Sequence, residues 1–467
     1  MKGNVERYKA RLVAKGFTQK ESIDYKETFS PVSTKDSFRV VMALVAHFDL
    51  ELHQMDVKTA FLNGNIEEDI YMVQPENFES EDSKRLVCKL KKSIYGLKQA
   101  SRQWYRKFDE VITSFGFVEN TVDQCIYLKI SGRKYVILVL YVDDILLASS
   151  DKDLLLETKK FLSSKFEMKD LGEASYVLGI EILRDRERCT LSLSQKAYIN
   201  KVLERFGMQD CKPFETPVAK GDKFSLKQCP NTSLEIAQMK DIPYASVVGS
   251  LMYAQVCTRP DIAYIVAVLG RYQSNPGIEH WKTAKRVMRY LQRTKDYMLT
   301  FRRVDCLEIE GYSDADFAGC PDSRKSTSGY VFMLAGGAIS WKSVKQTLVA
   351  SSTMEAEYVA CFEASKQGVW LRNFVTCLKI VNGIDRPLKI YCDNKAAELY
   401  AKNSRVSSRS KHIDIKYLVV KEKIQSGDIA IEHISTHSML ADPLTKGLPP
   451  RVFLEHVASM GIVRQDN

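Results

Sequence analysis

Two adjacent aspartates, Asp143 and Asp144, lie between two apolar runs in the middle of the chain. The runs, residues 136–140 and 145–148, predict two buried strands that meet at a turn. Carboxylates at such a turn repel each other and lose hydration, and an unpaired buried charge is costly or becomes protonated. A divalent cation can supply the missing positive charge. The pair therefore predicts a metal site suited to phosphoryl chemistry.

The composition limits the class of protein. The 467 residues allow roughly two to four domains of about 100–200 residues, and 45% of them are apolar. The formal charge of +10 and the pI of about 8.9 favour a polyanionic partner such as nucleic acid. The 11 cysteines are scattered, which is typical of reduced thiols rather than of a disulfide framework. The polar N-terminus and the interrupted apolar stretches predict an intracellular chain without a signal peptide or a membrane span.

Hydrophobic periodicity predicts the elements of the first 170 residues. Residues 9–17 and 51–56 predict strands, the second of which ends at Asp56. Residues 38–48 and 100–115 predict helices, and the apolar stripe of the second helix indicates core packing.

The pattern changes further along the chain. Residues 212–243 predict a linker, and residues 245–291 predict a helical block. A new unit is expected from Cys306, with strands at 308–313, 329–334 and 388–392 and helices at 353–378 and 413–424. This alternation predicts a small α/β domain. The last fifteen or so residues carry no pattern.

Ordered sequence boxes in the N-terminal part resemble the reverse transcriptase of copia-type long-terminal-repeat retrotransposons. They read RYKARLVAKGF at 7–17, TFSPV at 28–32, QMDVKTAFLNG at 54–64, SIYGLKQA at 93–100 and YVDD at 141–144. The resemblance covers nearly the whole chain. It implies an α/β and α+β multidomain fold: a right-hand polymerase with fingers, palm and thumb, then a connection segment and a ribonuclease H-like α/β domain.

The resemblance implies roles for the matched residues. Asp56, Asp143 and Asp144 would hold two Mg²⁺ ions, with Mn²⁺ as a substitute, for attack of a primer 3′-hydroxyl on an incoming α-phosphate. Asp144 is the less certain direct ligand because successive strand residues point to opposite sides. The residues implied to contact the nucleotide, the template or the primer end are Lys9, Arg11, Phe61, Gln99, Leu178 and Gly179. An exposed strand face for Lys9 and Arg11, and a core position for Phe61, stay open as alternatives.

The C-terminal part resembles ribonuclease H. Its boxes read GYSDADFAG at 311–319, SSTMEAEYVA at 351–360, IYCDN at 390–394 and HSMLADPL at 437–444. The resemblance implies that a second pair of metal ions is held by Asp314, Glu357, Asp393 and Asp442 for phosphodiester hydrolysis, and that His437 helps the product to leave. Glu355 stays open as an alternative to Glu357, and Asp316 is interpreted as a neighbour of Asp314.

The resemblance also implies a domain organisation. Residues 1–170 correspond to truncated fingers and palm, 171–243 to the primer grip, thumb and linker, 244–305 to the connection, 306–450 to the ribonuclease H-like domain and 451–467 to a tail. A further fingers strand is expected upstream of Met1, so the chain is interpreted as an N-terminally truncated part of a polyprotein.

The implied function is an RNA- and DNA-directed DNA polymerase with ribonuclease H activity that copies retrotransposon RNA into DNA. The implied partners are an RNA template, a DNA primer, the RNA–DNA hybrid, dNTPs and other parts of the Gag and Pol polyproteins, with no membrane. The expected location is a cytoplasmic virus-like particle, with the nucleus as an alternative. The competing functions are an inactive nucleic-acid-binding relic and a fragment that retains ribonuclease H activity only.

Overall fold

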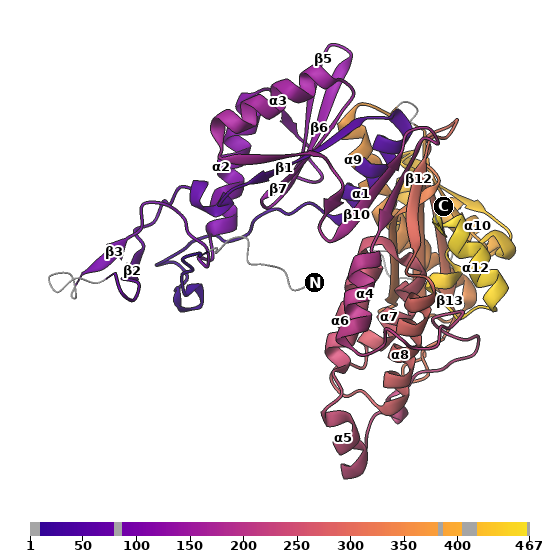
Figure 1. Cartoon of the computed structure of the whole chain (residues 1–467). Coiled ribbons are helices and arrows are strands. Elements are labelled where there is room, and N and C mark those ends of the chain that lie inside the picture. The colour runs from indigo at the N-terminus through magenta and orange to yellow at the C-terminus, as the bar shows by residue number, and fades with distance from the viewer. Residues whose placement is uncertain (1–9, 79–85, 382–385, 404–417, 465–467) are drawn as a thin grey trace. The chain divides into compact units, whose positions relative to one another are not determined.

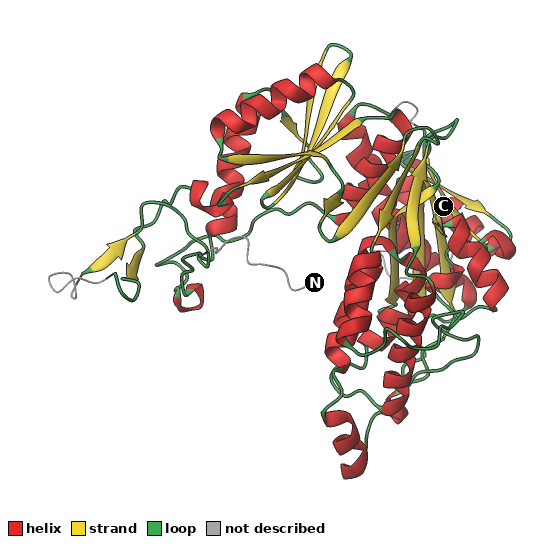
Figure 2. Ribbon diagram, in the orientation of Figure 1, coloured by secondary structure: helices red, strands yellow, loops and turns green. Residues whose placement is uncertain are grey.

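The structure, a computed structural model, describes residues 10–78, 86–381, 386–403 and 418–464. The chain divides into two compact units. Unit 1 comprises Met1–Thr34 and Leu50–Ala174, and unit 2 comprises Lys35–Asp49 and Ser175–Asn467. Both units combine helices and strands (Figure 1, Figure 2), so the predicted mixed α/β multidomain architecture is confirmed.

Unit 1 is built on a six-stranded antiparallel sheet of order β4-β5-β6-β7-β1-β8. Its described elements are η1 (Gly16–Thr18), β1 (Glu51–Val57), η2 (Ala60–Asn63), β2 (Tyr71–Val73), β3 (Val87–Lys89), α2 (Ala100–Ser114), β4 (Val118–Glu119), β5 (Ile126–Ser131), β6 (Lys134–Tyr141), β7 (Asp144–Ser149), α3 (Lys152–Lys165) and β8 (Met168–Glu173). Helices α2 and α3 lie against the sheet (Figure 1), and their side chains share one hydrophobic core with it. The strands predicted at 51–56, 136–140 and 145–148 and the helix predicted at 100–115 are confirmed.

The strand predicted at residues 9–17 is wrong for the residues that the structure describes. Val13 makes an isolated parallel bridge to Tyr95, and the Ala14 amide donates to the Tyr95 carbonyl at 2.7 Å. The chain then enters η1 at Gly16. A strand requires a ladder of backbone hydrogen bonds, and a single bridge does not supply one. Lys9 lies outside the described residues.

Unit 2 contains two five-stranded sheets, of order β18-β12-β11-β10-β9 and β15-β14-β13-β16-β17. Their strands are β9 (Tyr176–Val177), β10 (Ile180–Asp185), β11 (Thr190–Ser194), β12 (Tyr297–Arg302), β13 (Glu310–Asp316), β14 (Thr327–Leu334), β15 (Gly337–Lys345), β16 (Leu388–Cys392), β17 (Ile429–His433) and β18 (Ile462–Arg464). Strand β13 is antiparallel to β14 and parallel to β16, with Ser313 opposite Cys392. Asp314 and Asp393, the residues that follow these two, therefore lie side by side toward the same end of two neighbouring strands.

The helices of unit 2 come from distant parts of the chain. They are α1 (Lys35–Phe48), α4 (Lys196–Arg205), α5 (Ser233–Lys240), α6 (Tyr244–Thr258), α7 (Ala263–Gly270), α8 (Ile278–Arg293), α9 (Thr353–Leu378), α10 (Lys395–Lys402), α11 (Val419–Gln425) and α12 (Pro450–Ser459), with short turns η4 (Leu226–Gln228), η5 (Pro260–Ile262), η8 (Thr436–Ser438) and η9 (Asp442–Leu444). The predicted helix at 353–378 and the helical block at 245–291 are confirmed. Among the described helices, none has both the length and the apolar character needed to span a bilayer.

The structure has regular elements in two segments where the sequence shows little periodic pattern. Helix α5 lies inside the predicted linker, where a capping box of Thr232 and Glu235 satisfies its first amides. The last residues contain α12, which begins at Pro450, and β18, which pairs with β12. A strand of three residues that pairs with a distant partner leaves no local periodicity to detect.

A buried ion pair fixes the join between α6 and α7. The Arg259 and Asp261 side chains are 1% and 0% exposed, and Arg259 Nη2 lies 2.7 Å from Asp261 Oδ2. The Tyr290 hydroxyl donates to the same oxygen at 2.6 Å, and Arg259 Nη1 donates to the Thr294 carbonyl at 3.2 Å. Removal of one partner would leave a buried charge without its counter-ion, which is strongly destabilising.

The Asp261→Ala variant is therefore expected to lose about 3–5 kcal/mol of unfolding free energy. Urea unfolding of the full chain, followed through the transition of unit 2, measures this loss. The matched control is Glu279→Ala, which breaks a pair with Lys282 whose side chains are 50% and 62% exposed and should cost at most about 1 kcal/mol. Equal losses in the two variants would contradict a structural role for the buried pair.

Candidate active sites

The first acidic group lies where β1 and β7 pair in unit 1. Asp56 and Asp144 are opposite each other in this antiparallel ladder. Asp143 precedes Asp144 in the turn between β6 and β7, and the Val57 amide donates to the Asp143 carbonyl at 2.9 Å. The fold thus gathers the three predicted carboxylates around one end of two neighbouring strands.

The turn that carries Asp143 is held by helix α2. Val142 has a φ of +60°, a left-handed conformation that is strained for a β-branched residue. The Trp104 Nε1 donates to the Val142 carbonyl at 2.6 Å, and Trp104 is only 2% exposed. The sequence identified Trp104 as a core residue only. Its hydrogen bond gives it a second role, which is to fix the turn that presents the acidic pair.

The electrostatics of this group suit a cation. Asp144 is half-buried, and burial raises its pKa, with smaller contributions from Asp143 and Asp56. Gln54 Nε2 donates to Asp144 Oδ1 at 2.9 Å and opposes this shift. Carboxylate oxygens are the ligands that Mg²⁺ prefers. Among the described residues, however, the sets of three ligands whose atoms all lie within 4.8 Å of one another do not include this trio, so a cation shared by all three requires side-chain rotation.

Three other predicted nucleotide-binding residues lie in unit 1, two of them around Tyr95. The Arg11 guanidinium is 5.4 Å from the centre of the Tyr95 ring, and the Phe61 ring is 5.0 Å from it. Gln99 is fully buried, and its Nε2 donates to the Asp24 carbonyl at 2.9 Å. The roles predicted for Arg11, Phe61 and Gln99 stay predictions.

The predicted primer-end contact lies in unit 2. Leu178 and Gly179 form the tight turn between β9 and β10, with φ values of +55° and +73°. The Tyr253 hydroxyl of α6 donates to the Leu178 carbonyl at 2.5 Å. The turn is thus held by a helix of the predicted connection segment, and its contact with a primer stays a prediction.

The second acidic group lies in unit 2, at the carboxyl ends of the neighbouring parallel strands β13 and β16. Asp314 on β13, Asp393 after β16 and Asp442 at the start of η9 each offer an oxygen, and these atoms all lie within 4.8 Å of one another. Glu357 on α9 forms a second set with Asp393 and the Cys392 sulfur. Asp314, Glu357 and Asp442 are 1%, 6% and 5% exposed. Such closely spaced oxygens fit a hard divalent cation such as Mg²⁺.

The structure distinguishes the two glutamates of α9 by their contacts. Glu355 Oε2 accepts hydrogen bonds from the Ser351 amide and hydroxyl, both at 2.6 Å, at the start of the helix. Glu357 Oε1 accepts from the Ala315 amide of β13 at 3.2 Å. Glu357 is therefore the glutamate that lies beside Asp314. Burial and the Asp314 charge raise the pKa of Asp316, which belongs to neither set of close ligands among the described residues.

Two further residues contact this group and were not predicted from the sequence. Lys446 Nζ lies 2.9 Å from Asp442 Oδ1 and 3.5 Å from Asp314 Oδ2. The Thr445 hydroxyl donates to Asp314 Oδ2. The spacing of Asp442 and Lys446, four residues apart, is the signal that could have suggested their contact.

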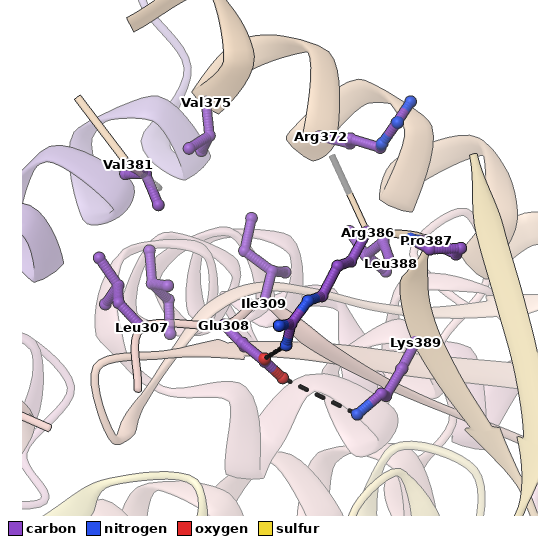
Figure 3. Close-up of a pocket in the computed structure, with 11 residues that line it drawn as sticks. Leu307, Glu308, Ile309, Arg372, Val375, Val381, Arg386, Pro387, Leu388 and Lys389 are labelled. Carbon is purple, nitrogen blue, oxygen red and sulfur yellow. Dashed lines mark hydrogen bonds and ion pairs between the residues drawn. The ribbon is translucent and has the colours of Figure 1, made fainter. Parts of the chain in front are cut away.

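His437 is exposed in η8, one residue after Thr436, whose side chain hydrogen-bonds Asp393. Together with Tyr312 and His456 it lines a hollow of about 620 Å³. A smaller hollow of about 60 Å³ lies at the opposite end of β16, around Leu388 (Figure 3). It is lined mainly by apolar side chains and by Glu308, which pairs with Arg386 and Lys389 at 3.5 and 3.8 Å. None of the clustered carboxylates lines it, so the smaller hollow is separate from the acidic group.

The buried acids predict a pH dependence of stability. Burial raises the pKa of Asp314, Asp393 and Asp442, and it raises that of Glu357 well above its ordinary value. The metal-free folded chain therefore keeps protons that the unfolded chain releases. Stability from these groups is present at low pH and is lost as the pH rises through their folded pKa values, at up to about 1.4 kcal/mol per pH unit for each proton.

We expect the unfolding free energy of the chelator-treated chain to fall from mildly acidic to neutral pH, and Glu357→Gln to reduce this slope. Denaturant unfolding over that pH range tests it. The control is Glu363→Gln, a change on the same helix at a residue outside the acidic group. An unchanged slope in Glu357→Gln would contradict a raised pKa at Glu357.

Comparisons with known proteins show the family of the chain. Residues 2–220 match the family model described as "Reverse transcriptase (RNA-dependent DNA polymerase)". The Pol polyprotein of transposon TNT 1-94 from Nicotiana tabacum is 49% identical over 448 residues, which cover 96% of this chain and 33% of that protein. The Pol polyprotein of transposon RE1 from Arabidopsis thaliana is 40% identical over 462 residues, covering 99% and 31%.

A shorter relative is covered almost completely. A putative transposon Ty5-1 protein of Saccharomyces cerevisiae is 32% identical over 311 residues, which are 66% of this chain and 98% of that protein. Among solved structures, the foamy viral protease-reverse transcriptase in complex with ds DNA matches 85% of this chain and 60% of that one at 12% identity, with a TM-score of 0.21, which carries no argument about the fold.

The family model assigns residues 2–220 to the reverse transcriptase family. The chain belongs to the family of retrovirus-related Pol polyproteins of copia-type transposons, as the sequence predicted. It spans about a third of the length of the Pol polyproteins that it matches.

Proposed function

We propose that this chain carries the polymerase and ribonuclease H activities of a copia-type Pol polyprotein. In this proposal residues 1–170 act as fingers and palm, 171–243 as primer grip and thumb, 244–305 as connection and 306–450 as a ribonuclease H-like domain. The observation that carries the proposal is the presence of two separate acidic groups, one in each compact unit. The match of residues 2–220 to the reverse transcriptase family model supports the first activity.

The polymerase group would hold Mg²⁺, which supplies charge neutralisation for the attacking and leaving oxygens when it is bound. Asp56 and Asp143 would be its main protein ligands. Asp144 would be oriented by Gln54, whose side-chain amide donates a hydrogen bond to that carboxylate. Trp104 would keep the turn from moving when negatively charged substrate arrives, because it anchors the Val142 carbonyl.

The nuclease group would hold Mg²⁺ between Asp314, Asp393 and Asp442. Glu357, which lies close to Asp393, would be the fourth carboxylate of the group. Its support is geometric: four acids from β13, α9, the end of β16 and η9 lie together although they are far apart in sequence. The sheet order β15-β14-β13-β16-β17, with parallel β13 and β16, is what brings two of them to one edge. His437, exposed beside this group, would assist release of the cleaved strand.

The proposed substrates are dNTPs, an RNA template, a DNA primer and the RNA–DNA hybrid. The net charge of +10 supports a polyanionic partner. Recognition would follow the shape and 2′-hydroxyls of an A-form hybrid, and affinity would fall with salt through phosphate contacts. The proposed setting is a cytoplasmic virus-like particle or the nucleus, together with other Gag and Pol products.

The test uses the full chain in two assays under one set of conditions. Primer extension on an RNA template measures the first activity, and cleavage of a labelled RNA–DNA hybrid measures the second. Both are expected with Mg²⁺ and neither after chelation. Cleavage without extension would support a fragment with ribonuclease H activity only, and absence of both would support an inactive nucleic-acid-binding relic.

A further inference from the structure

Lys446 carries a positive charge into the Asp314–Asp393–Asp442 group. Its Nζ lies 2.9 Å from Asp442 and 3.5 Å from Asp314, and these two acid side chains are only 7% and 2% exposed. Buried carboxylates are tolerated when a counter-charge remains close to them. This ammonium therefore neutralises charge on two of the three aspartates whose ligand atoms lie within 4.8 Å of one another.

The backbone of Lys446 is anchored, whereas its side chain has room to leave. The Lys446 amide donates to the Asp442 carbonyl at 3.2 Å, and the Thr445 hydroxyl donates to Asp314, so one short segment supplies an acid, a hydroxyl and an ammonium. The Lys446 side chain is 35% exposed. A flexible four-carbon stem allows the ammonium to turn to solvent without movement of the turn that holds Asp442.

We propose that Lys446 is a tethered cation, which holds the three aspartates together in the absence of metal and is displaced when a divalent cation binds them. The inference deepens the proposed nuclease function, because it concerns the same acidic group. Two cations that share Asp442 Oδ1 and Asp314 Oδ2 would repel each other at close range in a poorly hydrated site. Lys446 is thus a positioning residue that sets the metal concentration at which the group binds a divalent cation.

The experiment measures metal binding directly. The full chain carries Asp143→Asn to weaken the first acidic group, and free Mn²⁺ is followed by electron paramagnetic resonance during titration. Thermal unfolding is recorded with a chelator and with Mn²⁺. The variants are Lys446→Met and the charge-retaining Lys446→Arg. The matched control is Lys423→Met, since Lys423 is 39% exposed and lies 3.1 Å from Asp428, which belongs to neither set of close ligands among the described residues.

We expect Lys446→Met to bind Mn²⁺ about tenfold more tightly, because the competing charge is gone. The same variant should melt at a lower temperature with chelator, and Mn²⁺ should restore its stability. Lys446→Arg should restore most of the wild-type behaviour. Lys423→Met should keep the wild-type Mn²⁺ affinity, and any loss of its melting temperature should be the same with and without metal.

Unchanged or weaker Mn²⁺ binding in Lys446→Met would overturn the inference, as would a melting loss that Mn²⁺ does not restore. Absence of Mn²⁺ binding at this group in every variant would overturn it too. Hybrid cleavage by the chain without Asp143→Asn is measured separately. If that cleavage depends on Asp314 while Lys446→Met leaves Mn²⁺ affinity unchanged, the proposed nuclease function stands and the tethered-cation role fails.

Discussion

The Asp143→Asn variant is expected to extend a primer on an RNA template about 10³-fold more slowly than the unaltered chain. Asp143 presents its carboxylate from a turn that Trp104 and Val57 hold by hydrogen bonds. The amide keeps the size of the side chain but removes the negative charge that retains a cation. The expected factor corresponds to about 4 kcal/mol of lost transition-state stabilisation.

A matched control separates loss of a ligand from loss of charge in general. Asp153 is exposed in the first turn of α3 in the same unit, so Asp153→Asn should leave extension unchanged. The Asp143→Asn variant should also still cleave the hybrid, because the acids proposed for cleavage lie in unit 2. Equal incorporation by Asp143→Asn and the unaltered chain would refute the assigned polymerase group.

The Asp314→Asn variant is expected to cleave the RNA strand of a hybrid about 10³-fold more slowly while it still extends primers. Asp314 is 1% exposed and joins two other acids within 4.8 Å. Because these carboxylates repel one another, the neutral amide should not destabilise the metal-free fold. The lost activity therefore reports loss of a ligand rather than loss of folding.

Two measurements make this second result interpretable. Circular dichroism of Asp314→Asn should match that of the unaltered chain. Asp305→Asn, a change at an exposed aspartate before β13, should leave cleavage unchanged. Cleavage at the original rate by Asp314→Asn would remove Asp314 from the catalytic group.

Elements with a strong local pattern could be predicted from the sequence. The helices at 100–114 and 353–378 bury a continuous stripe or face, and β6 and β7 are apolar runs on either side of a turn. Strand β18 could not be predicted, since its pairing with β12 is decided by distant residues. Residues 10–17 have strand-like composition but gain only one bridge, so composition alone was misleading there.

The acids of both groups could be proposed from the sequence because their boxes keep a recognisable order. Their supports could not. The sequence shows Trp104 only as part of an apolar helix stripe, and its hydrogen bond to the Val142 carbonyl appears only in the folded chain. Gln54 likewise has the pattern of an ordinary strand residue, and its hydrogen bond to Asp144 depends on the pairing of β1 with β7. Lys446 reads as a surface lysine until η9 brings it to Asp314. Each of these contacts depends on tertiary structure rather than on local spacing.

The central claim is that one chain holds two separate metal-binding acidic groups, and iron-mediated backbone cleavage tests it most directly. Fe²⁺ substitutes for Mg²⁺, and ascorbate with hydrogen peroxide generates radicals that cut the chain beside each bound ion. We predict cuts near residues 56 and 143 that Asp143→Asn abolishes, and cuts near 314, 393 and 442 that Asp314→Asn abolishes. Cuts in only one of these regions, or cuts that neither variant changes, would contradict the account.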